Sequence, residues 1–262
     1  MPDINASENI NNTYFKGYYK EIWRFFIPEQ FTEKEINFLL GYFKLEPGNC
    51  VLDIMCGYGR HSIGLARKGI AVTAVDILED YIVEINEIKQ KEKLPLTAVC
   101  DNVLQFNSIE KFDLAICMGN SLNFFDQRES ESLLSKVSSL LKPQGSLLIN
   151  TWSLCEIVAR NFQEKSQSKV GDFTFLADCK YLFHPSRIEI DSIITAPDGT
   201  TERKKAIDYI FSLNEMENML NRSGLELKEN FSIPGKKKFS LGDVRSYLIA
   251  GKMYTDEFLA IS

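Results

Sequence analysis

The segment Val51–Arg60 limits the possible folds of this chain more than any other. It reads Val-Leu-Asp-Ile-Met-Cys-Gly-Tyr-Gly-Arg, which is a short apolar strand, then a turn with two glycines, then the start of a helix. From Cys50 to about Lys142, short β-branched runs continue to alternate with longer helical patterns. Such alternation is typical of a parallel sheet covered by helices on both faces, and open sheets of this kind bind ligands at the turn after a strand. The sequence therefore predicts an α/β fold with a doubly wound sheet and a ligand site at this turn.

The residues around the turn indicate which ligand it holds. A dinucleotide fingerprint needs the pattern G-x-G-x-x-G, and Ser62 occupies the third glycine position. Asp53 would repel a pyrophosphate but would favour a ligand with a cationic amino group, such as S-adenosylmethionine. Asp76 ends the second strand, near the spacing at which an acidic side chain binds both hydroxyls of a ribose. These features favour S-adenosylmethionine over a nicotinamide cofactor, and a nicotinamide-dependent oxidoreductase is the first alternative.

Asp101 and Asn102 come directly after the third expected strand. Because parallel strands end at the same edge of a sheet, these side chains are placed to meet an adenine, with Asp101 accepting from the exocyclic amine. The alternative interpretation is that Asp101 caps the N-terminus of a helix.

The pattern resembles the class I S-adenosylmethionine-dependent methyltransferases, in particular the small-molecule branch whose first motif contains Cys-Gly-Tyr-Gly-Arg-His-Ser. The resemblance covers nearly the whole chain and departs from the commonest pattern at Gln144 and Met55. It implies a Rossmann-like seven-stranded sheet of order 3-2-1-4-5-7-6, with S-adenosyl-L-methionine as cofactor and S-adenosyl-L-homocysteine as product. The cofactor-binding residues that it implies are Asp53, Met55, Cys56, Gly57, Gly59, Asp76, Ile77, Asp101, Asn102, Val103, Met118 and Gly119.

The expected organisation is a single methyltransferase domain over residues 1–262. A helical N-terminal cap is expected at 13–43, the cofactor-binding core at 44–151, and the final helix with the closing strands at 213–262. Apolar side chains alternate with period two within 152–212, which predicts an inserted antiparallel β segment that serves as a lid or a dimerisation surface. We expect the first dozen residues to be frayed.

Local signals also predict individual elements. Asp126 with Glu129 resembles a capping box at the start of a long amphipathic helix. The expected strands of the core are Cys50–Ile54, Ala71–Val75, Leu96–Cys100, Phe112–Cys117 and Ser146–Asn150.

Methyl transfer from a sulfonium is an in-line displacement, so an enzyme contributes mainly by aligning the two reactants. For that reason no catalytic residue is assigned, and roles for Arg60, His61 and His184 do not follow from spacing. Aromatic rings favour cationic groups, and our hypothesis is that the N-terminal cap folds over the cofactor. The alternative is that these rings only pack a helix against the sheet. The candidates for the acceptor pocket are Tyr14, Tyr18, Tyr19, Trp23, Asn120 and Trp152.

Composition limits the kinds of partner that the protein is expected to bind. The net charge of -6 disfavours nucleic acid, and the loop Met118–Ser121 lacks the Asn/Asp-Pro-Pro-aromatic signature of methyltransferases acting on base amines. No C-x-x-C pair, membrane-spanning run or secretory signal occurs, so neither metal nor membrane is expected and the cytoplasm is the default location. A small-molecule acceptor is therefore predicted, with a protein acceptor or a non-catalytic cofactor-binding sensor or partner subunit as alternatives. Both a monomer and a homodimer are compatible with the sequence.

Overall fold

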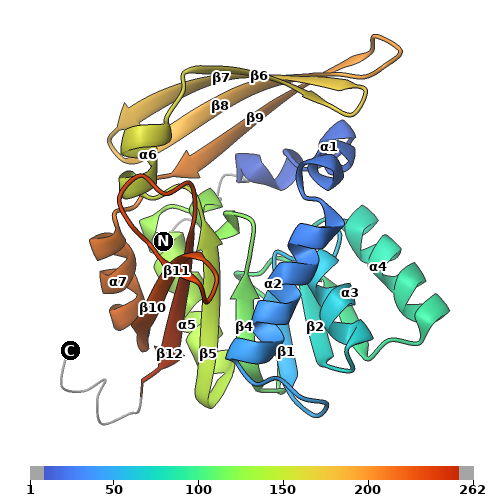
Figure 1. The fold of residues 1–262 in the computed structure, drawn as a ribbon, viewed down its shortest axis with the longest axis vertical. Helices are drawn as coiled ribbons and strands as arrows, with labels where there is room; N and C mark the ends of the chain where they lie inside the picture. Colours follow the sequence, from blue (N-terminus) through green and yellow to red (C-terminus); the bar gives the residue numbers. More distant parts are fainter. Residues whose placement is uncertain (1–8, 254–262) are drawn as a thin grey trace, which may run out of the picture. The chain divides into compact units, whose positions relative to one another are not determined.

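The computed structural model describes residues 9–253, whose contacts fall into two compact units (Figure 1). The larger unit contains residues 29–162 and 210–253, and the smaller one contains residues 9–28 and 163–209. Each unit is thus assembled from two separate stretches of the chain. The expected N-terminal cap, residues 13–43, is divided between them at Pro28.

A mostly parallel sheet forms the centre of the larger unit. When its seven long strands are numbered in chain order, their arrangement is that expected from the sequence, 3-2-1-4-5-7-6. One further strand of two residues pairs at the edge. The last long strand, β12, runs antiparallel to both of its neighbours. Across the sheet the strands are β3 (Leu96–Cys100), β2 (Ala71–Asp76), β1 (Cys50–Ile54), β4 (Phe112–Cys117), β5 (Leu141–Thr151), β12 (Ser246–Lys252), β10 (Leu225–Ile233) and β11 (Lys237–Lys238).

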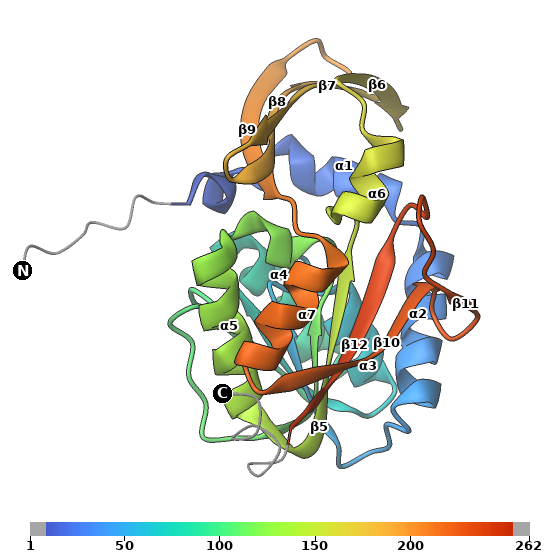
Figure 2. The same ribbon diagram turned by 90° about the vertical axis from the view of Figure 1, so that its left-hand side faces the viewer.

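Helices cover both faces of this sheet (Figure 2). Helices α2 (Glu29–Tyr42), α3 (Arg60–Arg67) and α4 (Glu79–Glu92) lie on one face, and α5 (Gln127–Leu140) and α7 (Leu213–Arg222) pack together on the other. The capping box expected at the start of α5 is present. A short 3-10 helix, η2 (Ser121–Phe124), follows β4.

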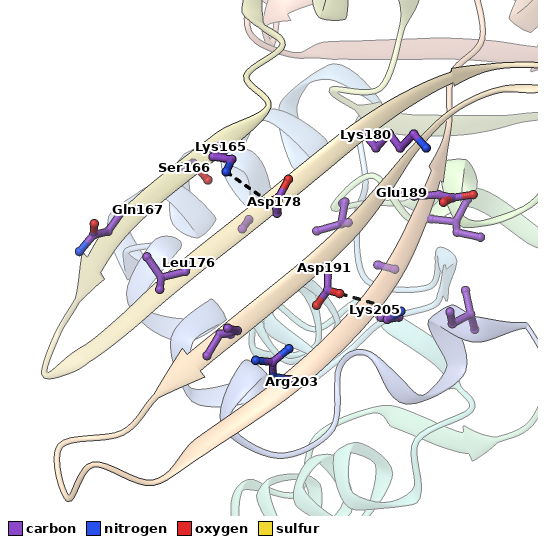
Figure 3. Close-up of a pocket in the computed structure, with 16 residues that line it drawn as sticks. Lys165, Ser166, Gln167, Leu176, Asp178, Lys180, Glu189, Asp191, Arg203 and Lys205 are labelled. Atoms are coloured by element: carbon purple, nitrogen blue, oxygen red, sulfur yellow. Dashed lines mark ion pairs between the residues drawn. The ribbon is translucent and has the colours of Figure 1, made fainter.

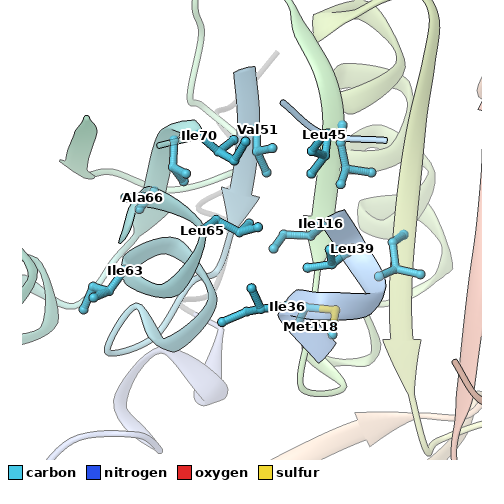
Figure 4. Close-up of a cluster of buried hydrophobic side chains, with 14 of the residues drawn as sticks. Ile36, Leu39, Leu45, Val51, Ile63, Leu65, Ala66, Ile70, Ile116 and Met118 are labelled. Carbon is cyan, nitrogen blue, oxygen red and sulfur yellow. The ribbon is translucent and has the colours of Figure 1, made fainter. Parts of the chain in front are cut away.

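Buried aliphatic side chains join α2 and α3 to the sheet (Figure 4). Leu39 of α2, Leu65 of α3 and Ile116 of β4 are all completely buried. Burying a side chain of this size stabilises the fold by about 1.5–3 kcal/mol. Because β1 is covered on both faces, four of its five residues are buried, which explains its continuous apolar run.

The smaller unit is a four-stranded antiparallel sheet with a helix against one face. Its strands are β6 (Lys165–Val170), β7 (Phe173–Phe183), β8 (Ser186–Thr195) and β9 (Thr201–Tyr209), paired in that order. Helix α1 (Tyr18–Phe26) packs on the sheet through Ile22, which contacts Val170 and Ile194. The sheet begins later than the expected insertion at 152–212, since α6 (Cys155–Asn161) belongs to the larger unit.

Of the first dozen residues, which were expected to be frayed, residues 1–8 lie outside the described range and residues 9–12 lie within it. A 3-10 helix, η1 (Ile10–Thr13), precedes α1. The buried side chain of Asn11 accepts from the backbone N–H of Ile207 at 3.0 Å and donates to its carbonyl at 2.9 Å. Asn11 thereby extends the pairing of β9. No helix within residues 9–253 combines the length and the apolarity needed to span a membrane.

Candidate functional site

The residues expected to bind the cofactor meet at one edge of the larger unit's sheet. β1, β2, β3 and β4 are parallel neighbours, and their carboxyl ends stand side by side in the order β3, β2, β1, β4. The backbone N–H of Asp101 donates to the carbonyl of Asp76, which joins the loop after β3 to the end of β2. The expected residues, Asp53 to Gly59, Asp76 and Ile77, Asp101 to Val103, and Met118 and Gly119, all lie in or beside these strand ends.

Asp76 holds the glycine turn in place through its side chain. One carboxyl oxygen accepts from the Gly57 backbone N–H at 2.8 Å, and the other accepts from the Leu78 backbone N–H at 2.9 Å. Burial raises the pKa of Asp76, and these backbone hydrogen bonds oppose the rise. Cys56 adds a backbone hydrogen bond to the carbonyl of Val75. The end of β2 thus fixes the turn, and Asp76 stands directly beside Gly57.

The two glycines of the turn have different surroundings. Both have positive φ angles, +57° at Gly57 and +76° at Gly59. A Cβ at Gly59 would lie 2.7 Å from Cγ1 of Ile85 in α4, so this glycine is required for packing. A Cβ at Gly57 would meet no heavy atom within 4 Å. The open side of the turn is therefore at Gly57, and a ligand there can approach the backbone beside the carboxylate of Asp76. This arrangement fits the ribose and methionyl parts of S-adenosylmethionine.

Asp53 is turned into the protein. Its side chain is 1% exposed, and Ser62 in the first turn of α3 donates a hydrogen bond to it at 2.5 Å. Burial raises the pKa of Asp53 to about 7, although the bond from Ser62 lowers it in part. Asp53, whose charge makes a dinucleotide unfavourable, therefore also links the end of β1 to the start of α3.

Asp101 and Asn102 form a turn and do not begin a helix. Asp101 accepts from the backbone N–H of Asn102, and the side chain of Asn102 accepts from the backbone N–H of Leu104. No helix lies between β3 and β4, so the interpretation of Asp101 as a helix cap is wrong. Nearby, Val103 is buried, while Ile77 is 40% exposed and offers an apolar surface at the end of β2.

Asn120 connects the loop after β4 with the loop after β5. Its side-chain oxygen accepts from the hydroxyl of Thr151 and from the backbone N–H groups of Trp152 and Ser153, at 2.9, 2.9 and 3.1 Å. Its side-chain nitrogen donates to the hydroxyl of Ser153. Asn120 is 1% exposed and has a φ angle of 69°. The expected acceptor-pocket residue is thus a buried connector, while Trp152 beside it is half-buried.

Met118 and Gly119 precede this connector in the loop. Met118 is buried in the apolar cluster beneath the sheet edge. Gly119 has a positive φ angle and donates its backbone N–H to the side chain of Asn150.

The expected aromatic residues of the N-terminal cap form one group in the smaller unit. The rings of Tyr14 and Tyr19 lie 4.5 Å apart, and those of Tyr19 and Trp23 stack at 6.1 Å. The hydroxyl of Tyr18 shares a hydrogen bond with that of Thr200. Tyr14 is 5% exposed, and burial raises its pKa to about 12, opposed by hydrogen bonds with Ser192 and Tyr19. Packing against the sheet accounts for Tyr14.

Glu35 is a buried charged residue that the sequence reasoning missed. It lies in α2, is 3% exposed, and contacts Arg60 and His61, the two motif residues without an assigned role. The available signal was a glutamate next to Ile36 on the apolar face of a helix, where a carboxylate needs partners.

The smaller unit also carries a hollow on the sheet face that bears the charged residues (Figure 3). Its volume is about 990 Å³. Lys165 pairs with Asp178 at 3.7 Å, and Lys205 pairs with Asp191 at 3.9 Å. None of the expected site residues lines this hollow. Within residues 9–253, no group of three or more His, Cys, Asp or Glu is arranged to hold a metal ion.

Residues 51–145 match a family model described as a methyltransferase domain. The chain is 28% identical over 162 residues to glycine N-methyltransferase of Rattus norvegicus, covering 55% of each protein. It is 26% identical over 166 residues to glycine/sarcosine N-methyltransferase of Aphanothece halophytica, covering 62% of this chain and 63% of that protein. The chain thus spans less than two thirds of the length of these two relatives. The fold matches the crystal structure of a S-adenosylmethionine-dependent methyltransferase from Clostridium acetobutylicum ATCC 824 with a TM-score of 0.75 at 17% identity, over 85% of this chain and 92% of that one.

Proposed function

The chain belongs to the class I S-adenosylmethionine-dependent methyltransferases, and on that premise we propose that it methylates a small-molecule acceptor. One observation supports the assignment of the cofactor to particular residues. The carboxylate of Asp76 accepts from the backbone N–H of Gly57, and no heavy atom lies within 4 Å of the position of a Cβ at Gly57. Glycine and sarcosine, named as acceptors of the two relatives, are small molecules. The net charge of -6 also favours a small acceptor over a nucleic acid.

The proposed cofactor site uses the strand ends in three parts. The turn at Gly57 holds the methionyl part, and Asp76 accepts from the ribose hydroxyls. Asp101 and Asn102 bind the adenine, with the exposed side chain of Ile77 against the ring. The other residues of the proposed site are Asp53, Met55, Cys56, Gly59, Val103, Met118 and Gly119. Of these, Asp53 and Gly59 contribute through packing beside the turn, since the side chain of Asp53 is buried and Gly59 lies against Ile85.

When bound, S-adenosylmethionine supplies a methyl group activated by its sulfonium charge. The residues of this chain orient the acceptor in line with that group and exclude water from it. The proposed role for Asn120 is to set the spacing of the two loops beside the acceptor through Thr151 and Trp152. Positioning of this kind can supply effective molarities of about 10⁵ M or more, so a dedicated base is needed only for an acceptor that must lose a proton.

Isothermal titration with S-adenosylmethionine, and in parallel with NADH, tests the cofactor site. The wild type is expected to bind S-adenosylmethionine only, with a Kd in the micromolar range, which corresponds to a binding free energy of about -8 kcal/mol. Asp76→Ala should weaken this binding at least about tenfold, because both the ribose acceptor and the anchor of the turn are lost. Asp80→Asn is the matched control, since Asp80 is an exposed acidic residue at the start of α4. Wild-type protein that does not bind S-adenosylmethionine contradicts the proposal.

Transfer to the acceptor is tested separately, by following S-adenosyl-L-homocysteine release with a panel of amine, hydroxyl and thiol metabolites. Turnover with one of them supports a small-molecule enzyme. Cofactor binding without turnover on any metabolite, but with methylation of added proteins, would instead favour a protein acceptor.

A further inference from the structure

The start of helix α3 has an unusual charge arrangement. The helix begins at Arg60, directly after the glycine turn, and its first turn contains no acidic residue. Its N-cap, Gly59, has no side chain to accept a hydrogen bond. The N-terminus of a helix carries a partial positive charge, so a buried arginine there is unfavourable unless a negative charge lies close by. The side chain of Arg60 is only 11% exposed.

Glu35 of α2 supplies that negative charge from a separate helix. One carboxyl oxygen accepts from Nη1 of Arg60 at 2.5 Å and from Nε2 of His61 at 3.0 Å. The other accepts from the hydroxyl of Tyr247 in β12 at 2.7 Å. Arg60 also donates to the hydroxyl of Thr32, one turn before Glu35 in α2. Both residues of α3 thus bond to the same oxygen of a single carboxylate.

The protonation states fit this arrangement. Burial alone would raise the pKa of Glu35, but hydrogen bonds from His61 and Tyr247 and the charge of Arg60 lower it to about 2. Burial and the charge of Arg60 lower the pKa of His61, while the hydrogen bond to Glu35 and its negative charge oppose the fall. His61 is therefore neutral at pH 7 and donates through Nε2 to the carboxylate. The cluster holds one negative and one positive charge, as a buried pair requires.

The glycine turn is joined to this cluster through the chain, because Gly59 directly precedes Arg60. The carbonyl of Gly59 accepts from the backbone N–H of Ile63, and the Gly59 N–H donates to the carbonyl of Cys56. Asp76 fixes the other side of the turn through Gly57. The turn is therefore held between β2 on one side and the first turn of α3 on the other.

We propose that Glu35 is a positioning residue for the cofactor: by fixing Arg60 and His61 it sets the conformation of the glycine turn that binds S-adenosylmethionine. This rests on the proposed location of the cofactor site. It assigns a role to both motif residues, Arg60 and His61, without requiring that either contact the cofactor.

Two measurements on Glu35→Gln test the proposal. In titrations with S-adenosyl-L-homocysteine, the Kd should rise about tenfold, because the neutral amide no longer compensates Arg60. In the ligand-free protein, backbone amides of residues 55–63 should exchange hydrogen for deuterium faster than in the wild type, whereas those of β4 should not. Once an acceptor is known, KM for S-adenosylmethionine should rise while kcat stays within about twofold.

Two controls separate positioning from general stabilisation. Glu92→Gln removes the ion pair with Arg67, at the far end of the same helix, and should change neither the Kd nor the exchange of residues 55–63. Tyr247→Phe removes a hydrogen bond to the other oxygen of Glu35 and should lower the melting temperature with less than a twofold change in Kd. If Glu35→Gln does not fold, Glu35→Asp, which keeps the charge but shortens the reach, is measured in its place.

The outcomes are distinct. Normal affinity and normal exchange in a Glu35 variant overturn this proposal alone. Equal loss of affinity in the Glu35 and Tyr247 variants also overturns it, since stability would then explain the effect. Absence of binding by the wild type overturns the proposed cofactor site instead.

Discussion

The hydroxyl of Ser62 donates a hydrogen bond to the carboxyl group of Asp53 at 2.5 Å, and both side chains are buried. Ser62 occupies the position at which a dinucleotide fingerprint has its third glycine, and its hydroxyl provides a buried partner for Asp53 at the end of β1. A neutral carboxylic acid is more easily buried than a carboxylate, and the raised pKa of Asp53 follows from this.

Asp53 should make the protein's stability depend on pH. Its pKa is about 7 in the folded protein and 3.8 in the unfolded chain, so its contribution to stability is fully present below pH 3.8 and is lost as pH rises through 7. Asp53→Asn removes this titration. We expect the free energy of unfolding of the variant, relative to wild type, to rise by about 2–3 kcal/mol between pH 5 and pH 8. Urea unfolding at the two pH values measures it, and a constant difference would contradict the assignment.

The two glycines of the turn should respond differently to alanine. Gly59→Ala places a Cβ against Ile85 and should destabilise the fold by about 2–3 kcal/mol. Gly57→Ala meets no neighbouring atom and should cost only about 1 kcal/mol for its positive φ angle. The loss of S-adenosylmethionine affinity should instead be larger at Gly57. Urea unfolding and titration of both variants decide the matter, and the reverse order of affinities would place the ligand elsewhere.

Removing the side chain of Asn120 should be costly because it takes one acceptor away from the Thr151 hydroxyl and from the backbone N–H groups of Trp152 and Ser153. Asn120→Ala is expected to lower the free energy of unfolding by about 1–3 kcal/mol. Asn120→Asp keeps an accepting oxygen and should lose less. Asn107→Ala is the control, since that side chain is exposed and donates to the nearby carbonyl of Gln105. Equal unfolding curves for wild type and Asn120→Ala would show that Asn120 does not stabilise the protein by connecting the two loops.

Tyr19 and Trp23 test the hypothesis that the aromatic cap contributes to the reaction. If these rings contact the cofactor or acceptor, Tyr19→Ala and Trp23→Ala should each lower kcat/KM by about 2–30-fold, corresponding to about 0.5–2 kcal/mol for a cation over an aromatic ring. Phe183→Ala is the control, because that ring is 72% exposed. Unchanged affinity and turnover in both variants would leave packing as the only role of the two rings.

Local sequence signals were sufficient to predict most strands of the larger unit's sheet. The bounds of β1, β3 and β4 agree with the sequence expectation, because turns or polar residues delimit short apolar runs there. β5 begins five residues earlier than expected, at Leu141, since the chain is already extended through Pro143. Helix α6 was missed because it lies within a segment interpreted as strands.

The roles of buried polar residues could not be derived in the same way. Glu35 and Tyr247 are far apart in the sequence but share a hydrogen bond, and no local pattern records such a contact. Asn120 was expected to face the acceptor because it follows β4, yet its partners come from the end of β5. Sequence spacing placed Asn120 in the loop directly after β4 but did not determine where its polar atoms point.

The discontinuous construction of the smaller unit affects how the chain is made. Helix α1 leaves the ribosome long before the strands that cover Ile22 exist, since the last of them, β8, ends at Thr195. Until then its apolar stripe has no partner within its own unit, whereas β1 to β5 can already pair with one another. During synthesis the nascent sheet is therefore ready to form before the N-terminal helix can dock, and α1 reaches its native contacts only after β8 has been made.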